Sequence, residues 1–140
     1  MITSFKSEYA FLSNFAPAKV VLDGLEYPTV EHAYQAAKTT DQYSRRDIKL
    51  LDSPGKAKRY GRSVIMRLDW HMVKDRIMMD LLKQKFKQEP YRTLLKNTGN
   101  QKLIEGNTWG DRYWGCEWQA GQWVGLNRLG YMLMYIRSEI

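Results

Sequence analysis

The stretch of residues 27–38 reads YPTVEHAYQAAK, and the rest of the chain is best understood in relation to it. Thr29 can act as a helix N-cap, because its hydroxyl accepts a hydrogen bond from an amide of the first turn. Pro28 disfavours helical dihedral angles at Tyr27, so the helix is not expected to extend further back. The alanines that follow favour a slim, regular helix. The sequence therefore predicts a helix that begins after Thr29 and reaches Lys38.

One face of this predicted helix carries an unusual set of polar side chains. Glu31, Gln35 and Lys38 stand at positions i, i+4 and i+7, so they share a face. One interpretation is a solvated stripe with a weak ion pair worth at most about 0.5 kcal/mol. The other is one wall of a site, with Glu31 and Lys38 pointing into a cleft. On this stretch alone the solvated stripe is the simpler interpretation.

Composition and length indicate a soluble globular protein. The chain has 140 residues, of which 44% are hydrophobic and 26% charged, which suits one domain with a real core. No signal peptide and no apolar stretch of about 18 residues is present, so no membrane association is expected. The single cysteine excludes an internal disulfide and fits a reducing compartment, so we predict a cytoplasmic location. With only two histidines a zinc site is disfavoured and no cofactor is expected, although carboxylates alone could hold a metal.

Positive charge is concentrated in the middle of the chain. Residues 45–102 contain 16 Lys/Arg and 6 Asp/Glu, a net of +10, whereas the remainder carries −3. A basic segment suits a polyanionic ligand such as a nucleotide, a pyrophosphate or nucleic acid. The alternative is a charged surface that only keeps the protein soluble.

The regions around the central helix predict a mainly helical fold. Residues 7–17 resemble a loop that presents Asn14, and Asp23-Gly24 between apolar runs predicts a hairpin over residues 19–27. Further helices are expected over residues 45–51, from Ser53-Pro54 to a terminating Gly61, and over 70–87, 90–95 and 128–137 with Asn127 as N-cap. We therefore predict an α+β class: one compact domain over residues 1–140, mainly α-helical with a small antiparallel sheet.

Residues 102–124 differ from the rest, because glycines separate four tryptophans. This composition favours a platform of loops and short strands, with residues 103–104 and 113–114 as the strand candidates. Glu105 and Asp111 lie in this segment, and carboxylates beside indole rings suit general acid or base chemistry. Cleavage of a bond to a sugar anomeric carbon needs such groups, because the transition state is oxocarbenium-like. The alternative is that both acids only cap turns around buried tryptophans.

Lys38 suggests a second kind of chemistry. A partly buried lysine can lose its proton near neutral pH and attack a carbonyl, such as the aldehyde of a ring-opened ribose. Glu31 could move the proton, although its charge would also hold the lysine protonated. Familiar nucleophile motifs such as G-x-S-x-G are absent, and Cys116 is interpreted as a small buried hydrophobe.

Several motifs together resemble the NADAR superfamily of YbiA-like N-glycosidases. They occur in the family's order and run nearly from end to end: Ser13-Asn14-Phe15, Pro28-Thr29-x-Glu31-His32-x-Tyr34-Gln35-Ala36-x-Lys38, Gly61-Arg62, Trp70, Met78 to Phe86, Leu103-x-Glu105, Asp111-x2-Trp114-Gly115 and Gly125-x-Asn127-x-Leu129-Gly130. Each motif is weak by itself, but the ordered set is specific.

The resemblance implies hydrolysis of an N-glycosidic bond to a ribosyl group. The implied substrates are phosphorylated early riboflavin-pathway intermediates or ADP-ribosylated guanine in nucleic acid. The implied catalytic residues are Lys38, which would form a Schiff base, with Glu31, Glu105 and Asp111. The implied substrate-binding residues are Asn14, Phe15, Gln35, Arg62, Trp114, Gly115 and Asn127.

One segment departs from the family pattern. Residues 116–124 form a tryptophan-rich insert where relatives have a glycine-rich loop, which leaves substrate choice open. A rival hypothesis from another class is a non-catalytic ADP-ribose, nucleotide or nucleic-acid binding module that uses the basic segment and the tryptophans. A degenerate family member with a structural role is a third hypothesis, against which the intact motifs argue.

Overall fold

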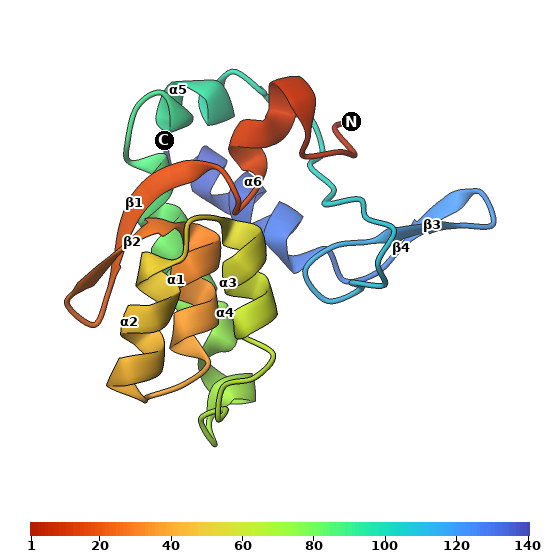
Figure 1. Ribbon diagram of the computed structural model, residues 1–140. Helices are drawn as coiled ribbons and strands as arrows, with labels where there is room; N and C mark the ends of the chain where they lie inside the picture. Colours follow the sequence, from red (N-terminus) through yellow and green to blue (C-terminus); the bar gives the residue numbers. More distant parts are fainter. The chain divides into compact units, whose positions relative to one another are not determined.

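The computed structural model describes every residue of the chain, 1–140, and the chain divides into two compact units. The middle unit is Asn14–Gln88, and the terminal unit combines Met1–Ser13 with Glu89–Ile140. Helices outnumber strands in both units, and the sheets are two antiparallel pairs, β1–β2 and β3–β4 (Figure 1). The predicted α+β class, mainly helical with little sheet, is confirmed. The single domain expected over residues 1–140 stays a prediction.

The middle unit begins with the predicted hairpin. Strands β1 (Pro17–Leu22) and β2 (Leu25–Thr29) pair antiparallel, with Val20 opposite Tyr27 and both buried. The turn residues Asp23 and Gly24 have φ values of 48° and 81°, in the left-handed region that an Asp-Gly turn adopts readily. The hairpin prediction is therefore confirmed, together with its turn chemistry.

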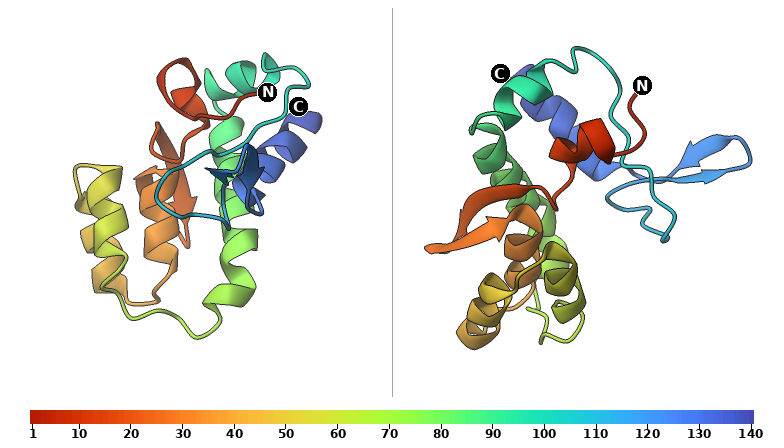
Figure 2. Two further views of the ribbon diagram at one scale, coloured as in Figure 1. Left: turned by 90° about the vertical axis from the view of Figure 1, so that its right-hand side faces the viewer. Right: turned by 45° about the horizontal axis from the view of Figure 1, so that its top comes forward.

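Helix α1 (Val30–Ala37) lies at the centre of the middle unit, and all its residues are buried. The helix contacts both strands and the three other helices of the unit: α2 (Gln42–Leu50), α3 (Pro54–Tyr60) and α4 (Trp70–Phe86). The left view of Figure 2 shows α1 between the α2–α3 pair and α4. The alanines of α1 allow these neighbours to approach closely.

The predicted helix starts are mostly confirmed. Thr29 accepts from His32 N at 3.0 Å, and Ser53 accepts from Lys56 N at 3.2 Å, so both act as N-caps. Helix α2 begins at Gln42 rather than at residue 45, because Asp41 accepts from Ser44 N at 3.1 Å and supplies a cap further back.

The terminal unit holds the 3-10 helix η1 (Ser7–Leu12), α5 (Tyr91–Lys96), β3 (Glu117–Gln119), β4 (Gln122–Val124) and α6 (Arg128–Ser138). The loop expected over residues 7–17 is thus partly helical. Residues 113–114 are not a strand, because the strands of this segment are β3 and β4, inside the tryptophan-rich insert. The β3–β4 hairpin projects from the loops on either side of it (Figures 1 and 2). None of the helices combines the length and apolar character that a bilayer crossing requires.

Candidate functional site

Glu31 and Gln35 lie on one face of α1, and both are buried. They are 7% and 3% exposed, and Gln35 Nε2 donates to Glu31 Oε1 at 3.1 Å. Burying a carboxylate is costly unless hydrogen bonds compensate for lost water, and the Gln35 amide provides one such bond. The solvated-stripe interpretation is therefore wrong for these two residues.

The oxygen of the Gln35 side-chain amide lies close to Gly61. Gln35 Oε1 is buried without a hydrogen-bond partner, and a Cβ at Gly61 would fall 1.9 Å from it. Gly61 has a φ of −59°, so the backbone conformation does not require glycine, as a helix-ending glycine normally would. Glycine is needed because of the close approach. Buried acceptors are normally paired, so this oxygen is a candidate ligand-binding atom.

Asn14 lies beside the first turn of α1. Its carbonyl oxygen accepts from Glu31 N at 3.1 Å, and its Nδ2 donates to Met78 Sδ at 3.6 Å. Its Oδ1 is a second buried oxygen without a partner. The side chain therefore does not bond to its own backbone as a turn residue would, and it is the backbone carbonyl of Asn14 that contacts Glu31. The neighbouring Phe15 is 43% exposed.

Lys38 follows the last residue of α1 and is half-buried. Burial lowers the pKa of its ammonium, the charge of Glu31 raises it, and the charges of Lys58, Arg62 and Lys74 lower it further. The net shift is downward, because burial is the largest of these effects. Arg62, the predicted phosphate ligand, is exposed and belongs to the group of cations that act on Lys38.

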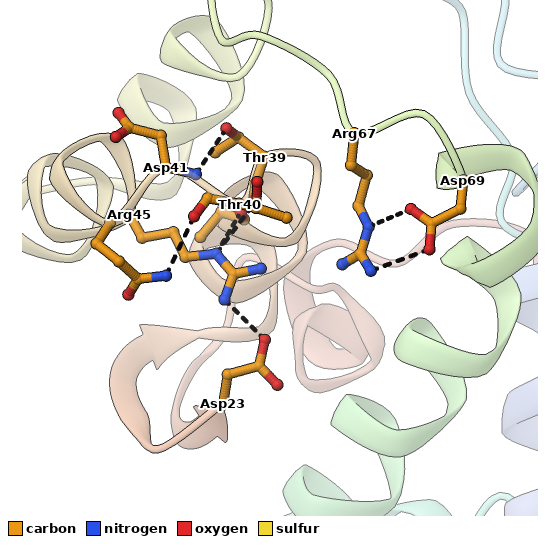
Figure 3. Close-up of polar contacts among 9 residues, drawn as sticks. Asp23, Thr39, Thr40, Asp41, Arg45, Arg67 and Asp69 are labelled. Atoms are coloured by element: carbon orange, nitrogen blue, oxygen red, sulfur yellow. Dashed lines mark hydrogen bonds and ion pairs between the residues drawn. The ribbon is translucent and has the colours of Figure 1, made fainter.

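Hydrogen bonds hold the backbone on both sides of Lys38, and Figure 3 shows one of these sides, where Arg45 lies beside Thr39 and Asp23. Arg45 is 3% exposed, and its Nε donates to Thr39 O at 2.9 Å and to Ala36 O at 3.2 Å. Its guanidinium also pairs with Asp23 Oδ2 at 2.7 Å. On the other side, Arg67 N donates to Lys38 O at 2.7 Å. These bonds satisfy carbonyls at the end of α1 and fix the point from which the Lys38 side chain departs.

Two residues counted in the basic segment are not surface charges. Arg45 and Lys85 are 3% and 0% exposed, because Arg45 caps α1 and Lys85 lies among the buried residues of α4. The surface available to a polyanion is therefore less basic than the sequence suggested.

In the terminal unit, hydrogen bonds to the backbone N–H and C=O of Glu105 fix the position of this residue. Glu105 N donates to Asn127 Oδ1 at 3.0 Å, and Glu105 O accepts from Cys116 N at 2.9 Å. A Cβ at Gly115 would fall 2.1 Å from Glu105 O and 1.8 Å from Glu105 Oε2, so only glycine allows the chain to pass this close to Glu105. Gly115, predicted to contact substrate, is thus explained by its approach to Glu105.

Asp111 organises the turn that follows it. Its Oδ1 accepts from Tyr113 N at 3.0 Å and from Trp114 N at 2.9 Å. This is the turn-capping arrangement that was the alternative to catalysis, so a catalytic role of Asp111 stays a proposal. Trp114 packs edge-on against Tyr113, with ring centroids 4.9 Å apart.

Asn107 is a residue that the sequence did not single out. It is 6% exposed, its Nδ2 donates to Glu105 Oε2 at 3.1 Å and to Asp111 O at 2.8 Å, and its Oδ1 accepts from Asp111 N at 3.0 Å. It therefore links the two acids of this segment. An asparagine among glycines is typical of an ordinary turn, so no sequence signal distinguished it.

Asn127 occupies the predicted N-cap position of α6, but its side chain does not cap the helix. Its backbone is left-handed, with φ of 53° and ψ of 39°, and its side chain makes no capping bond. Instead its Oδ1 accepts from Glu105 N, and its Nδ2 donates to Leu103 O at 2.9 Å. Asn127 therefore links the start of α6 to the segment that contains Glu105, and its side-chain amide is hydrogen-bonded to the backbone of Leu103 and Glu105.

Two of the tryptophans form a pair within the hairpin β3–β4. Trp118 and Trp123 face each other across β3–β4, with ring centroids 5.1 Å apart, while Trp109 is 55% exposed in the preceding loop. Burial raises the pKa of the Cys116 thiol, which agrees with its interpretation as a small hydrophobe. No group of three or more His, Cys, Asp or Glu side chains is placed to hold a metal ion.

The predicted site residues therefore form two clusters, each described within its own unit. Asn14, Glu31, Gln35, Lys38 and Arg62 gather around α1, and the residues from Glu105 to Asn127 gather around the start of α6. The fold and the two clusters define a small α+β protein with hydrogen-bonded carboxylates and a lysine of lowered pKa. Such groups are typical of an enzyme that transfers protons or uses an amine nucleophile.

The comparisons with known proteins identify the family. A model of the NADAR domain matches residues 3–140, and the chain belongs to the NADAR domain family. It is 40% identical to N-glycosidase YbiA of Escherichia coli (strain K12), over 98% of this chain and 85% of that one. It is 36% identical to N-glycosidase Npun_R5314 of Nostoc punctiforme, over 94% of this chain and 86% of that one.

A solved structure supports the same relationship. The NMR structure of the E. coli protein YbiA aligns with a TM-score of 0.82 at 40% identity, over 99% of this chain and 84% of that one. A further relative, the chloroplastic riboflavin biosynthesis protein PYRR of Zea mays, is 36% identical over 94% of this chain but only 23% of its own length.

Proposed function

We propose that this protein is an N-glycosidase that hydrolyses the N-glycosidic bond of a phosphorylated ribosyl substrate. Its membership of a family whose full-length relatives are named N-glycosidases supports the general reaction. The observation that carries the proposal is Lys38, whose pKa is lowered by burial and by the surrounding cations Lys58, Arg62 and Lys74. These cations also suit a phosphate group on the substrate.

The reaction replaces the bond between the anomeric carbon and the base nitrogen by a bond to water oxygen. As the bond breaks, positive charge develops on the ribose ring, and an ionised carboxylate nearby stabilises it. The base leaves with a proton, and water supplies the hydroxyl of the product. Glu31, Glu105 and Asp111 are the proposed carboxylates for these tasks.

A covalent variant of this route uses Lys38 as the nucleophile. Its neutral Nζ bonds to the anomeric carbon as the base departs, and loss of a proton with ring opening gives an imine. Water then hydrolyses the imine, which releases the ribose with its phosphate and restores the amine. The lowered pKa of Lys38 supports this role, because only the neutral amine can attack. The alternative is a charged Lys38 that holds a phosphate.

We propose two classes of substrate. The riboflavin-related name of the maize relative supports early riboflavin-pathway intermediates, and the basic residues around Lys38 also suit the pyrophosphate of ADP-ribosylated guanine in nucleic acid. Both substrates should be incubated with the protein side by side, and the released base identified by mass. Release of a base from neither substrate would contradict the proposal.

Borohydride reduction tests the role of Lys38. Trapping during turnover should add the mass of the ribosyl group to the peptide that contains Lys38, and Lys38→Ala should abolish both the adduct and turnover. Lys87→Ala, an exposed lysine of the same unit, is the matched control and should keep both. Normal turnover by Lys38→Ala would exclude the imine route.

The second candidate function is a non-catalytic binder of nucleotides or nucleic acid. The exposed Trp109 and Trp118 favour it, because indole faces stack on bases. A pure binder shows strongly salt-dependent affinity and no bond cleavage. Glu105→Gln separates the hypotheses, because an enzyme should lose turnover and keep binding.

A further inference from the structure

Both the NH2 group and the oxygen of the Asn107 side chain form hydrogen bonds with Glu105 or Asp111. Its Nδ2 donates to Glu105 Oε2 at 3.1 Å and to Asp111 O at 2.8 Å, with a long contact to Glu105 O at 3.5 Å. Its Oδ1 accepts from Asp111 N at 3.0 Å. The orientation of the amide follows from these partners, because a backbone N–H must face the oxygen and acceptor oxygens must face the NH2 group.

We propose that Asn107 is a positioning residue that holds Glu105 as an ionised carboxylate, which makes Glu105 the group that stabilises positive charge rather than the proton donor. This inference rests on the proposed N-glycosidase function. A donated N–H favours the ionised carboxylate, because protonation would remove an acceptor from that bond. An oxocarbenium-like transition state needs a charged carboxylate of this kind.

Two further contacts restrict the place of the Glu105 carboxylate. Gly115 lies against Oε2, where a Cβ would fall 1.8 Å away, and Asn127 Oδ1 holds the Glu105 backbone amide at 3.0 Å. Among the titratable groups of this unit, Cys116 interacts electrostatically with Glu105 and with Lys102. Cys116 carries no charge near neutral pH because burial raises the pKa of its thiol, so it does not oppose the ionised carboxylate.

Asn107→Asp is the sharpest substitution, because it keeps the shape of the side chain and replaces the donor by an oxygen. We expect kcat/KM to fall about 10- to 100-fold, the range for loss of a hydrogen bond to a charged group, with KM little changed. The acidic limb of the pH profile should move up by about one pH unit. Asn107→Ser retains a shorter donor and should recover part of the activity.

The matched control is Asn100→Asp, which makes the same change at an exposed asparagine of the same unit. Its pH profile should follow the wild type. If Glu105 were the proton donor, Asn107→Asp would instead move the alkaline limb upward and leave the acidic limb in place. That result, or a profile that does not move at all, overturns the assignment.

A direct titration tests the inference even where a variant folds poorly. Protein carrying 13C-labelled glutamate carboxyls, with Glu105 assigned by Glu105→Gln, should show Glu105 titrating below the usual glutamate midpoint of about 4.3. A midpoint at or above that value in the wild type overturns the inference. Failure of the wild type to release any base would instead overturn the proposed function. If the wild type turns over normally and the Glu105 midpoint is the same in Asn107→Asp as in the wild type, only the role of Asn107 is overturned.

Discussion

Gln35 Nε2 donates to Glu31 Oε1 at 3.1 Å, and both side chains are buried on the same face of α1. The terminal unit repeats this relationship, because Asn107 Nδ2 donates to Glu105 Oε2 at 3.1 Å. An amide is a neutral donor, so it orients a carboxylate without placing positive charge beside it. Preorganised donors and charges of this kind are the main source of electrostatic catalysis.

Replacing Gln35 should affect both stability and turnover. Gln35→Leu removes a donor from the buried Glu31 carboxylate, which should lower the free energy of unfolding by about 1–3 kcal/mol. Turnover should fall at least about tenfold, as expected when the position of a catalytic group loosens. Urea denaturation and steady-state kinetics measure the two effects. Gln42→Leu, at an exposed position of α2, is the control; equal behaviour of the two variants would refute the prediction.

Gly61→Ala should be destabilising although alanine is the better helix residue. The added Cβ would lie 1.9 Å from Gln35 Oε1, so Gln35 must move away from Glu31. We expect a loss of about 1–3 kcal/mol, as in other overpacked sites. Gly55→Ala is the matched control in α3, because a Cβ there meets nothing within 4 Å. It should be neutral or stabilise by up to about 1 kcal/mol; the same sign for both variants would contradict this account.

Protonation of His32 should weaken the fold at mildly acidic pH. The His32 ring is 1% exposed, its Nδ1 lies 2.7 Å from Thr29 Oγ1, and its Nε2 lies 3.0 Å from Leu51 O. Leu51 O can only accept, so Nε2 carries the proton of the neutral ring, and Nδ1 accepts from the Thr29 hydroxyl.

The sign of the pH effect follows from burial, which lowers the pKa of His32 below its usual value. The unfolded chain therefore binds the proton first, and stability should fall as pH drops through about 6.5 toward the folded pKa. Unfolding free energies between pH 8 and pH 5 measure this slope. His32→Asn should reduce it and the exposed His71→Asn should not; an unchanged slope in His32→Asn would count against the prediction.

Lys85 should produce a slope of the same sign at higher pH. Its side chain is fully buried, and burial lowers its pKa to about 7. The unfolded chain keeps the proton up to about pH 10.4, so stability should rise with pH between these values by at most about 1.4 kcal/mol per pH unit. Lys85→Met should flatten this rise, which chemical denaturation at several pH values detects. Lys87→Met is the exposed control; a rise that survives in Lys85→Met would reject the assignment.

Local sequence signals predicted the elements of the middle unit well. The Asp23-Gly24 turn and the caps Thr29 and Ser53 were all identified, because each is settled by bonds between near neighbours. Asp41 was missed as a cap for α2, since the charged residues that follow it resemble a loop.

The terminal unit was predicted less well, because its bonds join distant residues. Asn127 has the residue type and position of an N-cap, yet its amide bonds to Leu103 and Glu105, more than 20 positions away in the sequence. Asn107 gave no signal for a different reason: its partners Glu105 and Asp111 are near in sequence, but an asparagine at such a spacing is typical of an ordinary turn.

The sequence by itself determined the family, the helical elements and which residue types could carry the chemistry, because motif order and local periodicity are written along the chain. Only the tertiary structure decided that the Glu31–Gln35 face is buried, that Gly61 and Gly115 are glycine to make room for a close neighbour, and that Asn107 bonds to the Glu105 carboxylate. Burial and close approach depend on which distant segments pack together. For Lys38, whose residue type the sequence supplied, packing sets the direction of the pKa shift.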